Sequence, residues 1–283
     1  MARFARSMLV ASLTAATALL VLSGCSADKQ TKIEPKVAPP VIKKAGTLRV
    51  GIDLSYPPFG GVDKGKQAGH DLDVAGALAQ RLGLTLAVVD VKPAEAATAL
   101  TSGVVDAVFS VPFSEAGIAN VSLAGSYLTD APAFFVATEG TASVEPSLTV
   151  DNLGAGKIGV QEGSSAYWRL ASEVGTQGAV IFPTLREAIA AADKGKVKVV
   201  AGDAIVGAYI IRDFPKIQFA GQLDSAVPLG VAVTADNTKL GDTIREALDG
   251  LAADGVLKAI RQKWVGGLPA LTAAPSSDAS TTP

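Results

Sequence analysis

The stretch Gly46-Thr-Leu-Arg-Val-Gly-Ile-Asp-Leu-Ser-Tyr-Pro-Pro-Phe59 contains the first strong structural signal of the chain. Its first half, Thr47 to Ile52, is a short apolar run that predicts a β-strand, and the Pro-Pro pair predicts a rigid turn. From Asp71 to Leu82 apolar side chains recur at helical spacing, and Gly83 provides a helix stop. A strand followed by a helix is the first half of a crossover unit, which is typical of α/β folds.

The same alternation continues along the body of the chain. Apolar runs predict further strands at Leu86–Val91, Asp106–Ser110, Lys157–Gln161 and Lys198–Gly202. Helical spacing predicts helices at Ala94–Thr101, Ser164–Glu173, Leu185–Ala192, Ile205–Ile211 and, with a turn at Asp254-Gly255, at 240–264. These two successive groups of strands and helices imply two lobes.

Composition excludes several classes of function. The chain has 25 Lys and Arg against 27 Asp and Glu, so its formal net charge of −2 argues against a nucleic-acid partner. With 48% apolar and 18% charged residues it can bury a sizeable core. Its single Cys rules out an internal disulfide, and its single His argues against a His-based metal site or a Ser-His-Asp triad. We therefore expect no metal, cofactor or catalytic residue.

The first 24 residues have the order of a secretory signal peptide. Arg3 and Arg6 precede an apolar run from Met8 to Leu22, which is short for a membrane span. The run ends in Leu22-Ser-Gly-Cys25, which looks like a bacterial lipobox in which Cys25 becomes the lipid-modified first residue of the mature protein. A lipidated Cys25 would anchor the chain to the membrane on its extracytoplasmic face. The alternative is a plain signal peptide with a chance Cys.

Two flanking segments carry no helical or strand periodicity. Residues 26–45 contain five Lys and three Pro, so we expect residues 25–45 to form a lipidated Cys followed by a flexible tether. Residues 268–283 consist mostly of Ala, Ser, Thr and Pro, a composition that predicts a disordered tail.

Several motifs along the body resemble one known family. Besides the stretch from Gly46 to Phe59, they are Gly69-His-Asp-Leu-Asp-Val-Ala75, Ser102-Gly-Val-Val-Asp106, Gly159-Val-Gln-Glu-Gly-Ser-Ser165, Ala253-Asp-Gly-Val-Leu257 and Lys263-Trp264. In order and spacing they resemble family 3 of the bacterial extracellular solute-binding proteins, the polar amino acid receptors of ABC importers. The resemblance implies an α/β, type II periplasmic-binding-protein-like fold. In this fold two lobes joined by two crossing strands hold the ligand in a cleft and close on it like a hinge.

The resemblance also implies domain boundaries and partners. Lobe 1 would comprise residues 46–133 and 225–267, and lobe 2 residues 134–224, with crossings near Ala131–Ala137 and Leu223–Val227. The expected partners are a small polar solute and an ABC permease with its ATPase, and the protein is expected to be a monomer. Two alternatives on the same fold stay open: a dehydratase-like enzyme, and a ligand sensor coupled to a membrane kinase or channel.

Ligands of open α/β sheets lie beyond the carboxyl ends of the strands. The candidate ligand-binding residues in such loops are Asp53, Tyr56, Phe59, Ser110, Phe113, Gly163, Ser164, Ser165 and Asp203. The resemblance implies that Tyr56 packs on the ligand, that Asp53 reads a side chain or amine, and that Asp203 accepts a hydrogen bond from an amino group. The alternatives are structural: core aromatics in a rigid turn for Tyr56 and Phe59, and helix N-caps for Ser164 and Asp203.

The sequence departs from the family pattern at two places. Members that bind α-amino acids usually carry a carboxylate-clamping Arg after the third strand, but no Arg occurs between Arg81 and Arg169. Pro93 stands where the family often has a second aromatic residue. We therefore expect a site with no fixed cation in lobe 1, which favours a cationic or zwitterionic ligand. We assign His70 and Trp168 to packing.

Overall fold

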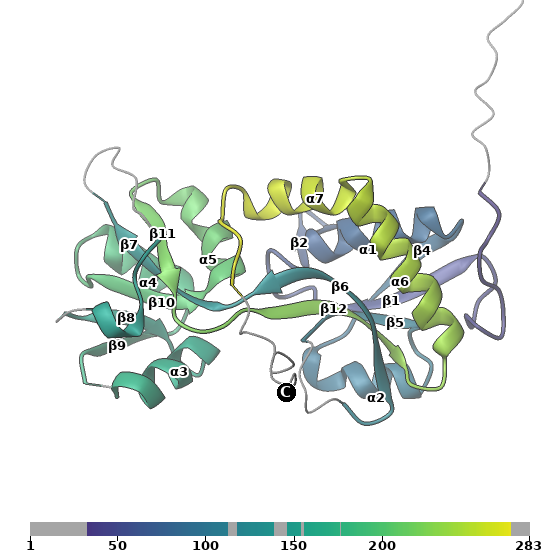
Figure 1. Ribbon diagram of the computed structural model, residues 1–283, viewed down its shortest axis with the longest axis horizontal. Coiled ribbons are helices and arrows are strands. Elements are labelled where there is room, and N and C mark those ends of the chain that lie inside the picture. Colours follow the sequence, from purple (N-terminus) through teal and green to yellow (C-terminus); the bar gives the residue numbers. More distant parts are fainter. Residues whose placement is uncertain (1–32, 113–117, 139–145, 154–155, 176, 273–283) are drawn as a thin grey trace, which may run out of the picture. The chain divides into compact units, whose positions relative to one another are not determined.

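The computed structural model describes residues 33–112, 118–138, 146–153, 156–175 and 177–272. Within these ranges the chain forms two five-stranded sheets and one short hairpin (Figure 1). The expected signal peptide, Cys25 and Phe113 lie outside the described residues. Within the described ranges, no helix is long and apolar enough to cross a membrane.

The sheet of lobe 1 has the order β4-β1-β5-β12-β6. Its strands are β1 (Thr47–Ile52), β4 (Thr85–Asp90), β5 (Ala107–Pro112), β6 (Val121–Asp130) and β12 (Val227–Thr234). Its helical segments are α1 (His70–Arg81), η1 (Pro93–Glu95), α2 (Ala96–Thr101), α6 (Thr238–Ala253) and α7 (Val256–Val265). Strand β1 pairs in parallel with β4 and β5, whereas β12 is antiparallel to both β5 and β6.

Both faces of the lobe 1 sheet are covered by helices. Along β5, Ala107 and Phe109 belong to the core that contains α1 and α6, whereas Val108 and Val111 belong to a second core beneath α2. Figure 1 shows α1 and α2 on opposite sides of the strands. Because successive side chains of a strand point to opposite faces, this apolar run is buried on both sides.

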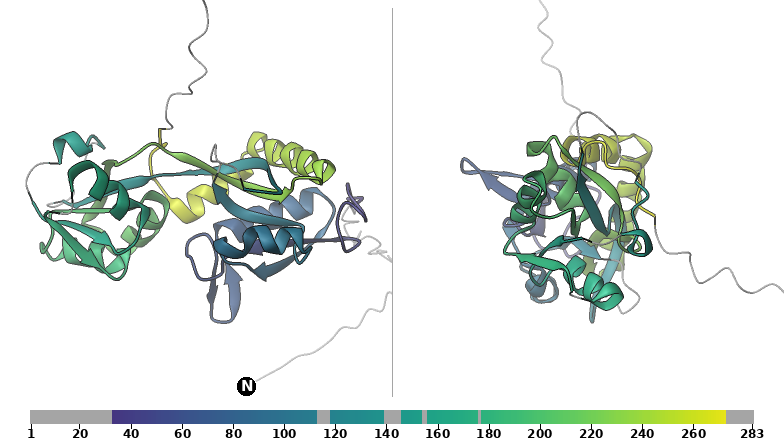
Figure 2. Two further views of the ribbon diagram at one scale, coloured as in Figure 1. Left: turned by 90° about the horizontal axis from the view of Figure 1, so that it is seen from below. Right: turned by 90° about the vertical axis from the view of Figure 1, so that its left-hand side faces the viewer.

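The turn that the sequence predicts after β1 is built into the start of α1. The backbone carbonyls of Pro58 and Phe59 accept hydrogen bonds from the amides of His70 (2.8 Å) and Asp71 (3.0 Å). These amides belong to the first turn of the helix, where they have no partner within the helix itself. The turn and the helix therefore hold each other in place. Between them lies the hairpin of β2 (Gly61–Asp63) and β3 (Lys66–Ala68), which extends away from the sheet (Figure 2).

The sheet of lobe 2 has the order β11-β7-β10-β8-β9. Its strands are β7 (Pro132–Ala137), β8 (Ile158–Gln161), β9 (Ala179–Phe182), β10 (Val199–Asp203) and β11 (Ile217–Gln222). Its helical segments are η2 (Val150–Asn152), α3 (Ser165–Val174), α4 (Leu185–Asp193), α5 (Ala204–Ile210) and η3 (Ile211–Asp213). Phe134 packs in the core with Leu170 of α3, and the next residue, Phe135, in the core with Ile189 of α4.

The chain passes twice between the sheets. Strand β6 ends at Asp130 and β7 begins at Pro132, so a single residue, Ala131, separates them. The return runs from the end of β11 at Gln222 to the start of β12 at Val227. Figure 1 shows both passages between the two sheets.

The described parts of the two flanking segments, residues 33–45 and 268–272, pack against the body of the protein. Val37 is 4% exposed and Ile42 is fully buried, and the side-chain amide of Asn237 donates to the carbonyl of Val41 (2.8 Å). The prediction of a flexible tether is therefore wrong for residues 33–45, because two apolar side chains bury against lobe 1.

The predicted tail also starts too early. Leu268 is buried, and Thr272 exchanges two hydrogen bonds with the side chain of Gln222 (2.7 and 3.1 Å). Residues 268–272 therefore lie against the return crossing, and residues 273–283 lie outside the described part of the chain.

Candidate functional site

A cavity of ≈ 240 Å³ lies beyond the ends of β1 and β4, along β5, and beside the two aspartates that end β6 and β10. Most of its lining is apolar. The lining residues are Asp53, Tyr56, Phe59, Asp71, Val91, Pro93, Ala96, Val108, Phe109, Ser110, Val111, Pro112, Ile118, Asp130, Asp203 and Leu229. Four carboxyl groups and no Lys, Arg or His side chain are among these described lining residues. This charge distribution is suited to a cationic group.

Five of the residues predicted from the sequence meet at this cavity: Asp53, Tyr56, Phe59, Ser110 and Asp203. Gly163, Ser164 and Ser165 are not among its lining residues. The hydroxyl of Ser164 instead accepts the amide hydrogen of Tyr167 (3.1 Å), so it is the N-cap of α3.

The aromatic turn after β1 forms one wall of the cavity. Tyr56 and Phe59 are stacked, with 5.6 Å between ring centroids and 5° between ring planes. Phe59 is 4% exposed and belongs to the core, whereas Tyr56 is 46% exposed. Partial burial raises the pKa of the Tyr56 phenol, and the nearby carboxyl groups of Asp203, Asp130 and Asp53 raise it further. Tyr56 therefore presents a neutral phenol near these carboxyl groups.

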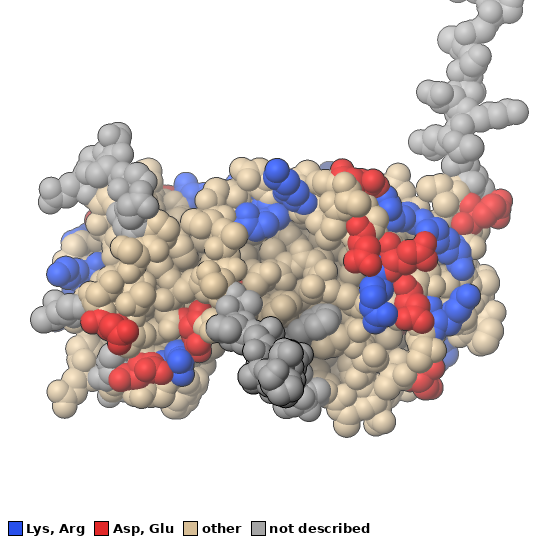
Figure 3. Space-filling model, in the orientation of Figure 1, with Lys and Arg blue, Asp and Glu red and all other residues tan. Residues whose placement is uncertain are grey.

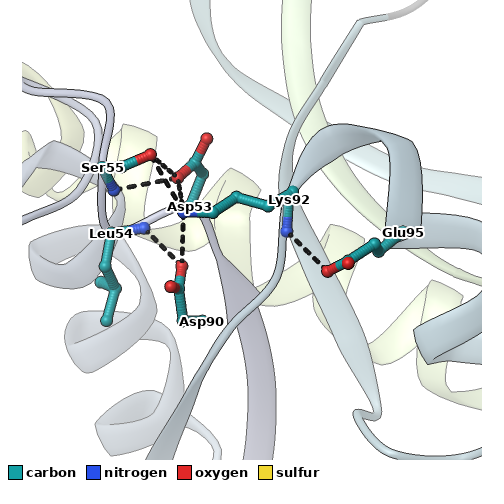
Figure 4. A network of polar contacts seen from close by, with 6 residues as sticks. All are labelled: Asp53, Leu54, Ser55, Asp90, Lys92 and Glu95. Atoms are coloured by element: carbon teal, nitrogen blue, oxygen red, sulfur yellow. Dashed lines mark hydrogen bonds and ion pairs between the residues drawn. The ribbon is translucent and has the colours of Figure 1, made fainter.

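Asp53 is paired with a lysine that the sequence reasoning did not place in the site. The Lys92 ammonium donates to Asp53 Oδ1 (2.7 Å), Ser55 Oγ (2.9 Å) and Asp90 Oδ1 (3.2 Å), as Figure 4 shows. Burial alone would raise the pKa of Asp53, but hydrogen bonds from Lys92 and Ser55 lower it below its usual value. Lys92 is thus a fixed cation beside the site that the expectation did not include, although it does not line the cavity and three oxygens already occupy its three donors.

Asp71, which the sequence reasoning also missed, lines the cavity and is hydrogen-bonded to two neighbouring side chains. It is 1% exposed and accepts hydrogen bonds from Ser110 Oγ (2.6 Å) and the Tyr127 hydroxyl (2.8 Å). The Tyr127 hydroxyl in turn accepts the Ser110 amide hydrogen (2.8 Å). These contacts hold Ser110 at φ 55, a left-handed conformation that is uncommon for a residue other than glycine. The Ser110 hydroxyl is thus engaged with Asp71.

His70 and Trp168 are assigned to packing from the sequence, and the two assignments have different outcomes. His70 is 1% exposed and stacks on Tyr127 with 5.7 Å between ring centroids, in keeping with a packing role. Trp168 is 64% exposed on α3, so its assignment to packing is wrong. Its ring contacts Tyr167 edge-on at 5.0 Å.

Asp203 and Asp130 form a buried pair at the end of the cavity. Asp203 Oδ1 caps α5 by accepting from the Val206 amide (2.8 Å), so the N-cap alternative for this residue is confirmed. Asp130 Oδ1 accepts from the amides of Ala131 (2.8 Å) and Ile205 (3.1 Å). Burial raises the pKa of both carboxyls, and for Asp130 the charge of Asp203 and the hydrogen bond to it raise the pKa further, to about 9. Burial beside a second carboxyl group thus favours the protonated form of Asp130.

Charged side chains are arranged differently on the outer surface and in the cavity. On the face shown in Figure 3, acidic and basic side chains lie close together, most densely over α6. Arg245 pairs with Asp242 (3.0 Å) and Arg81 with Asp254. Opposite charges at the surface are thus paired with each other, whereas Asp71, Asp130 and Asp203 lie in the cavity without a Lys or Arg partner among the described residues.

Comparison with known proteins identifies the family. Residues 48–267 match the family described as "Bacterial extracellular solute-binding proteins, family 3". The chain belongs to this family. Among its solute-binding relatives is the "Putative ABC transporter arginine-binding protein 2" of Escherichia coli (strain K12), which is 27% identical over 227 residues, covering 78% of this chain and 91% of that protein.

Solved structures agree with this assignment. The structure titled "Ancestral Cationic Amino Acid Solute Binding Protein (AncCDT-1)" aligns with a TM-score of 0.68 and 25% identity over 78% of this chain and 96% of its own. A "Histidine Kinase Sensor Domain with Similarity to Periplasmic Binding Proteins" aligns with a TM-score of 0.58 and 25% identity over 81% and 98%. The predicted type II periplasmic-binding-protein-like fold of this solute-binding protein is confirmed.

Proposed function

We propose that this solute-binding protein is the extracytoplasmic receptor of an ABC importer, and that it binds a small, amine-bearing polar solute of the amino acid class. The observation that carries the proposal is the cavity itself. Its described lining has four carboxyl groups, and the one cation in contact with them, Lys92, is already held by three oxygens. A ligand ammonium or guanidinium group would supply the missing positive charge.

The relatives support the cationic part of the proposal. One is named for binding arginine and one solved structure for cationic amino acids. In our proposal Asp203 accepts a hydrogen bond from the amino group, Tyr56 covers it, and the apolar wall formed by residues such as Val91 and Val108 contacts the rest of the solute. The protein acts as a monomer that closes on one solute molecule and is then recognised by the permease.

Binding measurements test this site directly. We would titrate the purified body with L-arginine, L-lysine and agmatine, and with L-glutamate and succinate as acidic controls. The cations should raise the melting temperature, since a ligand at 100 times its dissociation constant stabilises by about 2.7 kcal/mol. Asp203→Ala should weaken binding more than tenfold, a loss of at least about 1.4 kcal/mol.

Two matched variants distinguish the carboxylate-centred site from a site at the start of α3. Ser164→Ala, outside the cavity lining, should reduce affinity less than Asp203→Ala. Normal binding by Asp203→Ala together with failure of Ser164→Ala would contradict the amine-centred proposal. Tighter binding of glutamate or succinate than of any cation would contradict it as well.

Anchoring is a separate part of the proposal. Cys25 follows an apolar run and a Leu-Ser-Gly segment, and we propose that it carries the lipid that holds the receptor at the membrane. Cys25→Ser should release a soluble or unprocessed protein. Membrane retention of that variant with normal processing would refute the anchor.

A sensor role is the second candidate, and the similarity to a histidine kinase sensor domain favours it. Uptake of a radiolabelled solute distinguishes the two roles: a receptor deletion abolishes uptake if the protein serves transport and leaves uptake unchanged if it serves signalling only. The dehydratase-like alternative has no such support, because the matched family consists of solute-binding proteins.

A further inference from the structure

The Asp130–Asp203 pair results from the register between the two lobe 2 strands at the crossing. Asp203, the last residue of β10, lies opposite Pro132, the first residue of β7. Asp130, two residues before Pro132, is thereby brought beside Asp203, and both carboxyl groups line the cavity. On each of them, backbone amides occupy Oδ1.

The two carboxyl groups accept hydrogen bonds from consecutive amides at the start of α5, Asp130 from Ile205 (3.1 Å) and Asp203 from Val206 (2.8 Å), so they lie next to each other in a buried place. Two neighbouring carboxyl groups that are buried repel each other when both are ionised, which favours a proton on one of them. Burial and the charge of Asp203 raise the pKa of Asp130 to about 9, so we place the proton of the pair on Asp130. The ligand-free pair therefore carries a single negative charge.

Among the described neighbours of the Asp130–Asp203 pair, no Lys or Arg side chain is placed to neutralise the pair in place of the proton. From the loop after β1, the Tyr56 phenol and Asp53 face the pair, and Asp53 is neutralised by Lys92. Asp71 lies in the same cavity and is held by Ser110 and Tyr127. From α5 the pair meets only backbone amides. A positive charge that enters the cavity from solution is therefore the natural competitor of the proton.

We propose that an ammonium or guanidinium group of the ligand takes the place of the proton shared by Asp130 and Asp203, so that one proton leaves for each ligand bound. The inference rests on the proposed amine-bearing ligand and deepens it. The O–H bond of Asp130 breaks, its proton passes to water or buffer, and the ligand cation donates hydrogen bonds to both carboxylates. Asp130 is thus a second residue that determines specificity for cations.

This exchange makes affinity depend on pH. Where the empty pair holds its proton and the occupied pair does not, the dissociation constant should fall about tenfold for each unit of pH rise. We expect this slope between pH 6 and pH 8, where a guanidinium probe stays charged and Asp130, with a pKa of about 9, is still protonated in the empty site.

Calorimetry tests the exchange. Agmatine and L-arginine would be titrated at pH 7 in phosphate and in Tris, whose different ionisation enthalpies reveal the number of protons released. The wild-type protein should release about one proton per ligand. Asp130→Asn keeps the shape and the hydrogen bond of the protonated acid but has no proton to give up, so its release should be near zero and its affinity independent of pH.

The matched control is Asp213→Asn, which removes an exposed carboxylate that is paired with Arg186 (2.8 Å) and is not among the cavity-lining residues. It should release protons as the wild type does. Binding without proton release in the wild type, or an unchanged pH slope in Asp130→Asn, would overturn the inference alone. Failure of both probes to bind would overturn the proposed function and the exchange together.

A ligand-free measurement tests the shared proton itself. The folded-state pKa of Asp130 is raised, so its contribution to stability is fully present below the ordinary Asp value near 3.8 and is lost as pH rises toward about 9. The wild-type melting temperature should therefore fall more steeply over this range than that of Asp130→Asn. Parallel curves for the two proteins would show that Asp130 holds no extra proton and would overturn the inference.

Discussion

Replacing Tyr127 by Phe removes one hydroxyl group that makes two buried hydrogen bonds. This hydroxyl donates to Asp71 Oδ1 (2.8 Å) and accepts from the Ser110 amide (2.8 Å), in a residue that is 9% exposed. Loss of a hydrogen bond to a charged acceptor costs about 1.5–3 kcal/mol and loss of a neutral one about 1 kcal/mol. We expect Tyr127→Phe to lower the free energy of unfolding by about 2.5–4 kcal/mol. In a body of this size that corresponds to a melting temperature lower by roughly 5–16 °C.

Urea unfolding at pH 7 and thermal scans would measure this loss. The control is Tyr209→Phe, because the described residues show no hydrogen bond to the Tyr209 hydroxyl, while its ring packs near Trp264 at 6.3 Å. Agmatine affinity should also fall in Tyr127→Phe, since Ser110 loses the contact that holds its left-handed backbone at the cavity. A loss below about 1 kcal/mol, or one equal to that of the control, would refute the reasoning.

Three further perturbations probe the fold and the site. Ile42→Ala should destabilise the protein by about 2–5 kcal/mol in urea, because Ile42 is fully buried, whereas a loosely attached segment would lose nothing. Gly207→Ala should cost about 1–3 kcal/mol in the same assay, since an added methyl group meets the buried Phe135 ring; a neutral result would mean that the ring can move aside. Lys92→Met should raise the affinity for agmatine, because Asp53 loses its ion-pair partner and can bind the ligand. In the wild type, the ion pair stabilises the fold above the ordinary pKa of Asp, and this contribution is lost as pH falls through the lowered pKa of Asp53 in the folded state. An unchanged affinity and unchanged acid sensitivity in Lys92→Met would show that the ion pair is without consequence.

The strands and helices that could be predicted from the sequence are those with a clear apolar period. Thr47–Ile52 is β1, and the helix predicted from Asp71 is α1, shifted by one residue. Strands β6 and β12 were not predicted. Their pairing contains register shifts at Leu229/Gly230 and Val231/Ala232, which interrupt the two-residue alternation on which such a prediction depends.

Part of the candidate site could also be predicted, because some of its residues belong to strands that the apolar pattern shows. Asp203 is the last residue of β10 and Ser110 lies in the second half of β5, so both could be placed near the carboxyl ends of predicted strands. The partnership of Asp130 with Asp203, and that of Lys92 with Asp53, depend on contacts between segments 73 and 39 residues apart, which no local pattern encodes. The missing Arg favours a cationic ligand, which stays a prediction, whereas Lys92 shows that a cation can reach Asp53 from a neighbouring loop.

The position of β12 between β5 and β6 limits the order in which the chain can fold. Among the described strands, β6 is paired in the sheet with β12 alone, and β12 begins at Val227, after the whole of lobe 2 has been made. Pairing over so long a separation is slow, because the loop must close before any contact is gained. A growing chain therefore cannot complete its first lobe until most of it has been synthesised.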